Sequence, residues 1–243
     1  MTDLQGQDVK KDLEPNAVDG ALSITRTLVG IVPLVGSPLT ELVTAIFGSP
    51  VSKRRDDWLI YVVEGLEETK ARLKDFAPEN LKDNEQFISA TLQATQIAIR
   101  NHQREKLEAL RNAVLNTAIG INIDETVQLM FIEAIDTLTP LHLRVLKYFD
   151  DPKAYFENNN VPVPTGYQMG SRSQILELAL PEIKGNQQLS KIVVNELAAR
   201  GLLSDGSMAL TTVVSQDGLF NSLSSDMGKA FLQYINDPNK TSK

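Results

Sequence analysis

The residues best suited to proton transfer are the two histidines, His102 and His142. A histidine acts as a general base when a nearby carboxylate orients it, and Glu105 and Glu108 follow His102 on the same predicted helix. Charged pairs at helical spacing are common on exposed faces, so we expect this group to be solvated. His142 falls in the first turn of its predicted helix, where the helix dipole disfavours the charged ring. We therefore expect packing or solvent contacts for His142 and assign no catalytic residue.

Composition limits the remaining chemistry. The chain has no cysteine, which excludes disulfides, thiol catalysis and cysteine-ligated metal centres. Two histidines are too few for a multi-histidine metal site in one protomer. Gly30 and Gly36 are not followed by the lysine that a Walker-type phosphate loop requires. We predict a protein that is not an enzyme and has no metal, cofactor or small-molecule ligand, while sites built from carboxylates alone stay open.

A second kind of chemistry is recognition of nucleic acid or protein by one helix. The predicted helix over residues 187–200 carries five candidate contact residues, namely Gln187, Gln188, Lys191, Asn195 and Arg200. DNA binding needs several cations around such a helix to anchor phosphates. Only three lie nearby, with two carboxylates among them, and the whole chain has a net charge of -7. The charge disfavours nucleic acid and favours a protein partner.

The third candidate is the most apolar stretch of the chain, residues 21–47. Its uncharged part is shorter than the roughly 20 residues that a bilayer span needs, and prolines and glycines interrupt it. We predict a helical hairpin over residues 18–47 that packs within the chain or against a partner. Membrane association through residues 21–47 is an alternative, with four candidate contact residues, Leu28, Ile31, Val35 and Leu39.

The basic cluster Lys53-Arg54-Arg55 follows this apolar stretch. A basic collar next to an inserted segment strengthens binding to anionic lipid. Asp56 and Asp57 come directly afterwards and nearly cancel the local charge. The cluster is therefore expected to be the solvated start of a helix.

Hydrophobic residues at helical spacing predict a multi-helix domain with long amphipathic helices over residues 16–138. Ser49-Pro50 is a typical helix start. Residues 84–118 contain no Pro or Gly, which predicts one long helix or two collinear helices. Asp124 is expected to cap the next helix, whose predicted buried face consists of Val127, Met130, Phe131, Ala134, Ile135 and Leu138.

The composition changes at Thr139-Pro140, because all of the net charge falls in residues 1–138. Beyond this point we predict helices over 140–149, 173–180, 187–200 and 225–235, a polar loop over 150–170 and a β-like stretch over 202–214. Polar tails are predicted over 1–15 and 238–243. The N-terminal tail lacks the pattern of a secretory signal, and we expect a cytoplasmic protein.

Three segments of this second part resemble a winged helix. They are Leu189–Leu203, as a recognition-type helix that runs into a strand, the β-like stretch as a two-stranded wing, and Leu223–Tyr234 as the closing helix with Gly228 and Phe231. The resemblance implies a winged-helix-like α+β domain with a small β-wing over residues 139–237. The expected fold class is thus mostly α, with this domain following the N-terminal helices. Winged helices bind DNA or protein, or simply pack.

The whole arrangement, with its Gly/Pro-broken apolar segment, basic cluster, long helices and winged-helix-like end, resembles bacterial abortive-infection proteins of the Abi-alpha type. This resemblance implies a role in phage defence. Our leading hypothesis is a non-enzymatic cytoplasmic interaction protein whose winged helix contacts a protein partner or a second copy. A DNA-binding regulator and a membrane-active effector are the two alternatives.

Overall fold

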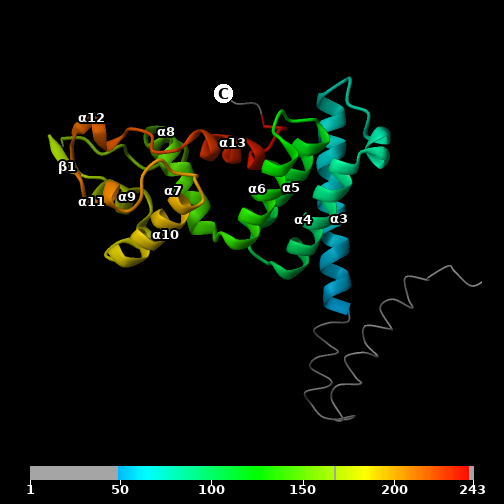
Figure 1. Ribbon diagram of the computed structural model, residues 1–243, viewed down its shortest axis with the longest axis horizontal. Coiled ribbons are helices and arrows are strands. Elements are labelled where there is room, and N and C mark those ends of the chain that lie inside the picture. The colour runs from blue at the N-terminus through cyan, green and yellow to red at the C-terminus, as the bar shows by residue number, and fades with distance from the viewer. Residues whose placement is uncertain (1–48, 167, 241–243) are drawn as a thin grey trace, which may run out of the picture. The chain divides into compact units, whose positions relative to one another are not determined.

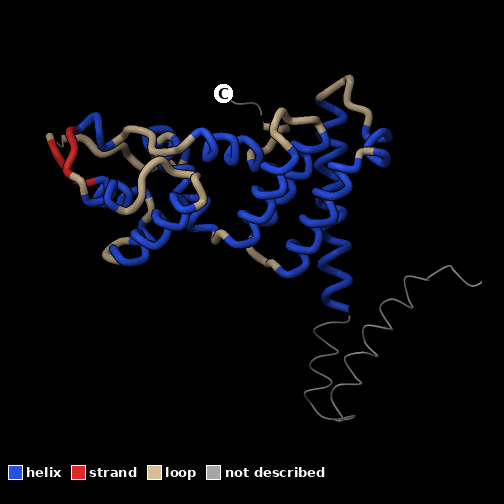
Figure 2. The backbone as a smooth tube through the Cα atoms, in the orientation of Figure 1, coloured by secondary structure: helices blue, strands red, loops and turns tan. Residues whose placement is uncertain are grey.

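The computed structural model describes residues 49–166 and 168–240, and it is mostly helical with one small antiparallel sheet (Figures 1 and 2). From Lys53 onward these residues belong to one compact unit. The predicted tail over 1–15 and the predicted hairpin over 18–47 lie outside the described residues. The same is true of the candidate contact residues Leu28, Ile31, Val35 and Leu39.

The first part of the described chain consists of helices only: α3 Ser49–Arg72, the short 3-10 helix η1 Pro78–Asp83, α4 Glu85–Arg100, α5 Arg104–Ala118 and α6 Glu125–Thr137. Ser49 and Pro50, the predicted helix start, are the first described residues, and both lie in α3. The predicted cap of α6 is confirmed as well, because the Asp124 side chain accepts a hydrogen bond from the Thr126 amide. On α6 the prediction for Met130 is wrong: it is exposed, and Ile132 is buried instead.

Residues 84–118 form two helices that pack side by side, so the prediction of one long or two collinear helices is wrong. The break occurs at Asn101, whose side-chain amide donates to Ile97 O and closes the end of α4. The buried residues of α4 include three alanines, and those of α5 include Ala109 and Ala113. These small side chains allow close packing, and a straight helix would leave much of this apolar surface in water.

Arg111 fixes α5 to α3. Its guanidinium donates to Tyr61 O at 3.0 Å and to Glu68 Oε2 at 2.8 Å. A Cβ at Gly65 would lie 2.8 Å from the guanidinium, so a side chain there would displace Arg111 from this position. Such a distance is well inside normal packing contact.

The second part contains helices α7 Pro140–Asp150, α8 Pro152–Asn158, α9 Arg172–Ala179, η2 Pro181–Ile183, α10 Gln187–Ala199, α11 Met208–Thr211, α12 Gln216–Leu219 and α13 Asp226–Ile235, and strands β1 Met169–Ser171 and β2 Val213–Ser215. The predicted helices agree with α7, α9, α10 and α13 to within a residue or two. The predicted loop over 150–170 instead begins with α8, which Asp151 caps and Pro152 starts. Asp-Pro is a helix-start pair that the sequence displayed.

The predicted wing has a different structure. β2 pairs with β1, which precedes α9, in the register Met169↔Ser215, Gly170↔Val214 and Ser171↔Val213. Residues 208–211 are helical because Ala209 and Leu210 are both buried. Two consecutive side chains point to opposite faces of a strand but can share the buried side of a helical turn. Leu203 forms only an isolated bridge, to Ser224.

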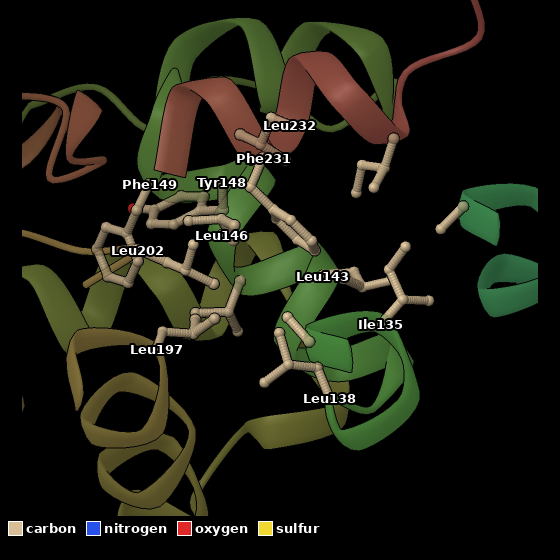
Figure 3. Packing of buried hydrophobic residues seen from close by; sticks show 14 of the residues in the cluster. Ile135, Leu138, Leu143, Leu146, Tyr148, Phe149, Leu197, Leu202, Phe231 and Leu232 are labelled. Carbon is tan, nitrogen blue, oxygen red and sulfur yellow. The ribbon is translucent and has the colours of Figure 1, made fainter. Parts of the chain in front are cut away.

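α13 packs against both α5 and α7. Phe231 meets Phe131 of α6 edge to face, with ring centroids 5.2 Å apart. Its surroundings, seen in Figure 3, include Leu143 and Leu146 of α7. Gly228 lets the helix cross the chain at Leu202, because a Cβ there would lie 2.1 Å from Leu202 O.

Polar groups of α5 bind the end of α13. The buried amide of Asn116 donates to Tyr234 O at 2.8 Å and to Asn236 O at 2.9 Å. Asn112 donates to Ile235 O at 2.9 Å. These carbonyls have no partner within their own helix, so the asparagines satisfy them in a buried place. Asn239, in the predicted C-terminal tail, accepts a hydrogen bond from Thr69 of α3.

Candidate functional site

The candidate site is the exposed side of α10. Asn186 caps its start by accepting a hydrogen bond from the Leu189 amide at 3.1 Å. Gly201, with φ of 71°, follows its end in the left-handed conformation that suits glycine. Its buried side consists of Ser190, Val193, Val194 and Leu197, which pack into the core. With that side fixed, the helical repeat decides which residues face water.

All five predicted contact residues are exposed. Gln187, Gln188, Lys191 and Asn195 share one arc of the helix, so the structure brings four of them together. Arg200 stands apart: it caps the C-terminus of α10 on another flank, where its charge acts on His142.

Sequence reasoning missed two apolar residues beside this arc. Ile192 is 46% exposed and lies between Lys191 and Asn195 in sequence. The Asn195 side chain accepts a hydrogen bond from the Ser207 amide at 2.8 Å, which holds the start of α11 next to α10. Met208, the following residue, is 81% exposed. We call Gln187, Gln188, Lys191, Ile192, Asn195 and Met208 together the α10 surface.

A signal for Ile192 was present in the sequence. Val193 and Val194 follow it directly, and three consecutive residues span about 200° around a helix, which is wider than the apolar stripe of a helix with one exposed side. The exposure of Met208 had no such signal, since it depends on the turn that Asn195 holds.

Behind the α10 surface, His142 joins α10 to α7. The Nδ1 atom accepts a hydrogen bond from the Thr139 amide at 3.2 Å, so the ring proton resides on Nε2. Nε2 donates to Glu196 Oε2 at 2.8 Å. Burial lowers the pKa of His142, and the Glu196 carboxylate opposes that shift without overcoming it. The neutral ring that the sequence predicted thus results chiefly from burial.

Carboxylates near α10 are engaged within the chain. Glu182 lies 3.2 Å from the Arg144 guanidinium, and Glu177 accepts a hydrogen bond from the Gly185 amide at 3.3 Å. Glu177 and Glu196 bind neutral donors, the Gly185 amide and the His142 ring, so both keep their negative charge beside α10.

The group around His102 does not form a catalytic arrangement. His102 is exposed in the turn between α4 and α5. Glu105 pairs with Arg144 at 2.9 Å, and Glu108 pairs with Arg104 at 3.0 Å. Neither carboxylate makes a hydrogen bond to the histidine. Over residues 49–166 and 168–240, no three His, Asp or Glu side chains cluster in a way that could hold a metal ion.

The basic cluster at the start of α3 is exposed and partly used within the chain. Arg54 donates to Ile99 O at 3.4 Å, and Arg55 pairs with Asp56 at 3.1 Å. No helix in the described part of the chain is long and apolar enough to cross a membrane.

Comparison with protein-family models, with curated proteins and with solved structures finds no match to this chain.

Proposed function

We propose that this protein is a non-enzymatic interaction protein that binds another protein through the α10 surface. The observation that carries this proposal is the composition of that surface: exposed Ile192 and Met208 stand among amides, with one lysine. Protein-binding surfaces combine an apolar centre with a polar rim. DNA-binding helices are instead surrounded by cations that neutralise phosphates.

A winged-helix assignment for residues 139–237 supports the choice of α10. With the short helices α8, η2, α11 and α12 set aside, the order is α7, β1, α9, α10, β2, α13, and α10 would take the place of the recognition helix. The pairing of β1 with β2 joins the strand before α9 to the strand after α10. In winged helices that helix is the usual contact element.

The cellular setting is part of the proposal. We place the protein in the cytoplasm, in phage defence, on the strength of the sequence features and the Abi-alpha resemblance. A DNA-binding regulator using Lys191 and Arg200 is the competing function, and its affinity would fall steeply with salt.

Photo-crosslinking tests the proposal. A photoreactive amino acid replaces Ile192 in the full chain, expressed in its natural host, and Leu178 is replaced in a matched control. Leu178 is a suitable control because it is an exposed leucine, 42% accessible, on α9. We expect a discrete protein adduct at position 192 that is absent at position 178. Nucleic acid adducts at 192, or the same adducts at both positions, would contradict the proposal.

A further inference from the structure

Helix α3 buries little apolar surface against the rest of the fold. Over residues 53–72 two apolar side chains are buried, Trp58 and Val62. Three large apolar side chains on the outer side of the helix are exposed, namely Leu59, Ile60 and Val63. The shorter helix α5 buries six apolar side chains. Apolar burial supplies most of the stability of a helix in a folded protein, so α3 depends more than α5 on polar contacts.

Side chains of α4 and α5 bind the middle of α3. Trp58 Nε1 donates to Thr95 Oγ1 of the neighbouring α4 at 3.0 Å (Figure 1). Arg111 of α5 donates to Tyr61 O and to Glu68. The Arg111 guanidinium also lies 4.6 Å from the centroid of the Tyr61 ring. Each of these contacts depends on one side chain of the neighbouring helix.

The C-terminal residues bind the end of α3. Asn239 Oδ1 accepts a hydrogen bond from Thr69 Oγ1 at 3.0 Å, and Asn239 Nδ2 donates to Gly65 O at 3.3 Å. The Thr69 side chain is buried by this contact region. Asp237 Oδ1 accepts a hydrogen bond from the Asn239 amide at 2.9 Å, which fixes the turn that brings Asn239 to α3. We call residues 237–240 the C-terminal clasp.

The clasp is fixed at its start, whereas α3 leads into an irregular link. Asn112 and Asn116 of α5 bind the carbonyls of Ile235 and Asn236, directly before the clasp. After α3, residues 73–77 connect to η1 without helix or strand. A few loop residues are enough to act as a hinge. Rotation about this link moves α3 and leaves the contacts of α5 with α13 intact.

We propose that α3 opens from the fold as a unit and that the C-terminal clasp controls this opening. An element with few buried apolar contacts opens at a lower free energy than the core around it. Opening uncovers Trp58 and Val62 on α3. It also uncovers Leu115 of α5, which is fully buried beneath Gly65. The closed form thus hides an apolar surface that the open form presents.

Hydrogen exchange of the full chain, followed by mass spectrometry, tests this device. The protection of backbone amides in α3 is compared with that in α5, first in the parent protein and then in Asn239→Ala. Asn159→Ala is the matched control, because it removes an amide-to-carbonyl bond of the same kind, to Tyr155 O, away from α3. The amides of α5 report in the same sample whether a variant loosens the whole fold.

We expect lower protection in α3 than in α5 in the parent protein. Asn239→Ala should lower the protection of α3 about fivefold further and leave α5 unchanged, since Thr69 keeps Gly65 O as an acceptor and the loss is modest. Asn159→Ala should change neither helix. Equal protection of α3 and α5 in the parent protein would overturn the separate opening. An Asn239→Ala variant with unchanged α3, or with α3 and α5 loosened alike, would overturn the role of the clasp.

Discussion

The Nε2 atom of His142 lies 2.8 Å from Oε2 of Glu196, and this contact connects the first turn of α7 to the side of α10. On its other nitrogen, the same ring accepts a hydrogen bond from the Thr139 amide at the start of α7. One neutral imidazole thus makes a hydrogen bond at the start of α7 and another to α10. Its protonation removes the acceptor that the Thr139 amide uses.

The stability of the fold should therefore depend on the protonation of His142. Burial holds the folded-state pKa below the unfolded value of about 6.5. The unfolded chain then takes up the proton more readily, so the stabilisation is complete above about pH 6.5 and is lost as the pH falls through the folded-state pKa. One group changes the free energy of unfolding by at most about 1.4 kcal/mol per pH unit.

Urea unfolding at about pH 7.5 and about pH 5.5 measures this effect. The His142→Gln variant keeps a neutral polar side chain, and its free energy of unfolding should fall less over the same interval. Equal pH dependence in the two proteins would show that His142 contributes nothing to it.

Gly228 should tolerate no side chain. In Gly228→Ala the new Cβ would meet Leu202 O at 2.1 Å, so α13 must move away from the chain it crosses. We expect a loss of about 1–3 kcal/mol in the free energy of unfolding, measured by urea titration. Gly170→Ala is the matched control, because its Cβ would lie 3.4 Å from its nearest neighbour. The prediction fails if both variants stay within about 0.5 kcal/mol of the parent protein.

The asparagine contacts with α13 should stabilise the fold in proportion to their burial. Asn116→Ala leaves the carbonyls of Tyr234 and Asn236 without this donor, at a cost of about 1–3 kcal/mol. Asn159→Ala removes a similar bond, to Tyr155 O, that is exposed to water. Thermal unfolding of the two variants should separate them clearly. Equal melting temperatures would mean that water replaces the Asn116 amide.

Features set by local sequence were predicted well. Helix α7 starts at Thr139, which caps it, and Pro140, and α10 starts at its capping residue Asn186. Each of these residues acts within a single turn of its helix. The exposed positions of Gln187, Gln188, Lys191, Asn195 and Arg200 were predictable for the same reason. The buried valines and leucine of α10 leave these positions on the outside.

Features that depend on distant contacts were not predictable. β2 pairs with residues more than forty positions earlier, and no pattern in Val213–Ser215 identifies that partner. The packing of α4 beside α5 depends on a hydrogen bond from the Asn101 side chain to Ile97 O, which ends α4 within an otherwise helical stretch. Met208 lies beside α10 because the Asn195 side chain accepts a hydrogen bond from the Ser207 amide. Each of these depends on tertiary packing more than on propensity.

The affinity of the protein for the partner crosslinked at position 192 tests the central claim most directly. Isothermal titration compares the parent protein with Ile192→Asp and with Leu178→Asp, both of which place a carboxylate at an exposed apolar position. We predict that Ile192→Asp weakens binding by about tenfold or more and that Leu178→Asp leaves the Kd unchanged. Equal affinities for all three proteins would contradict the assignment of α10 as the binding surface.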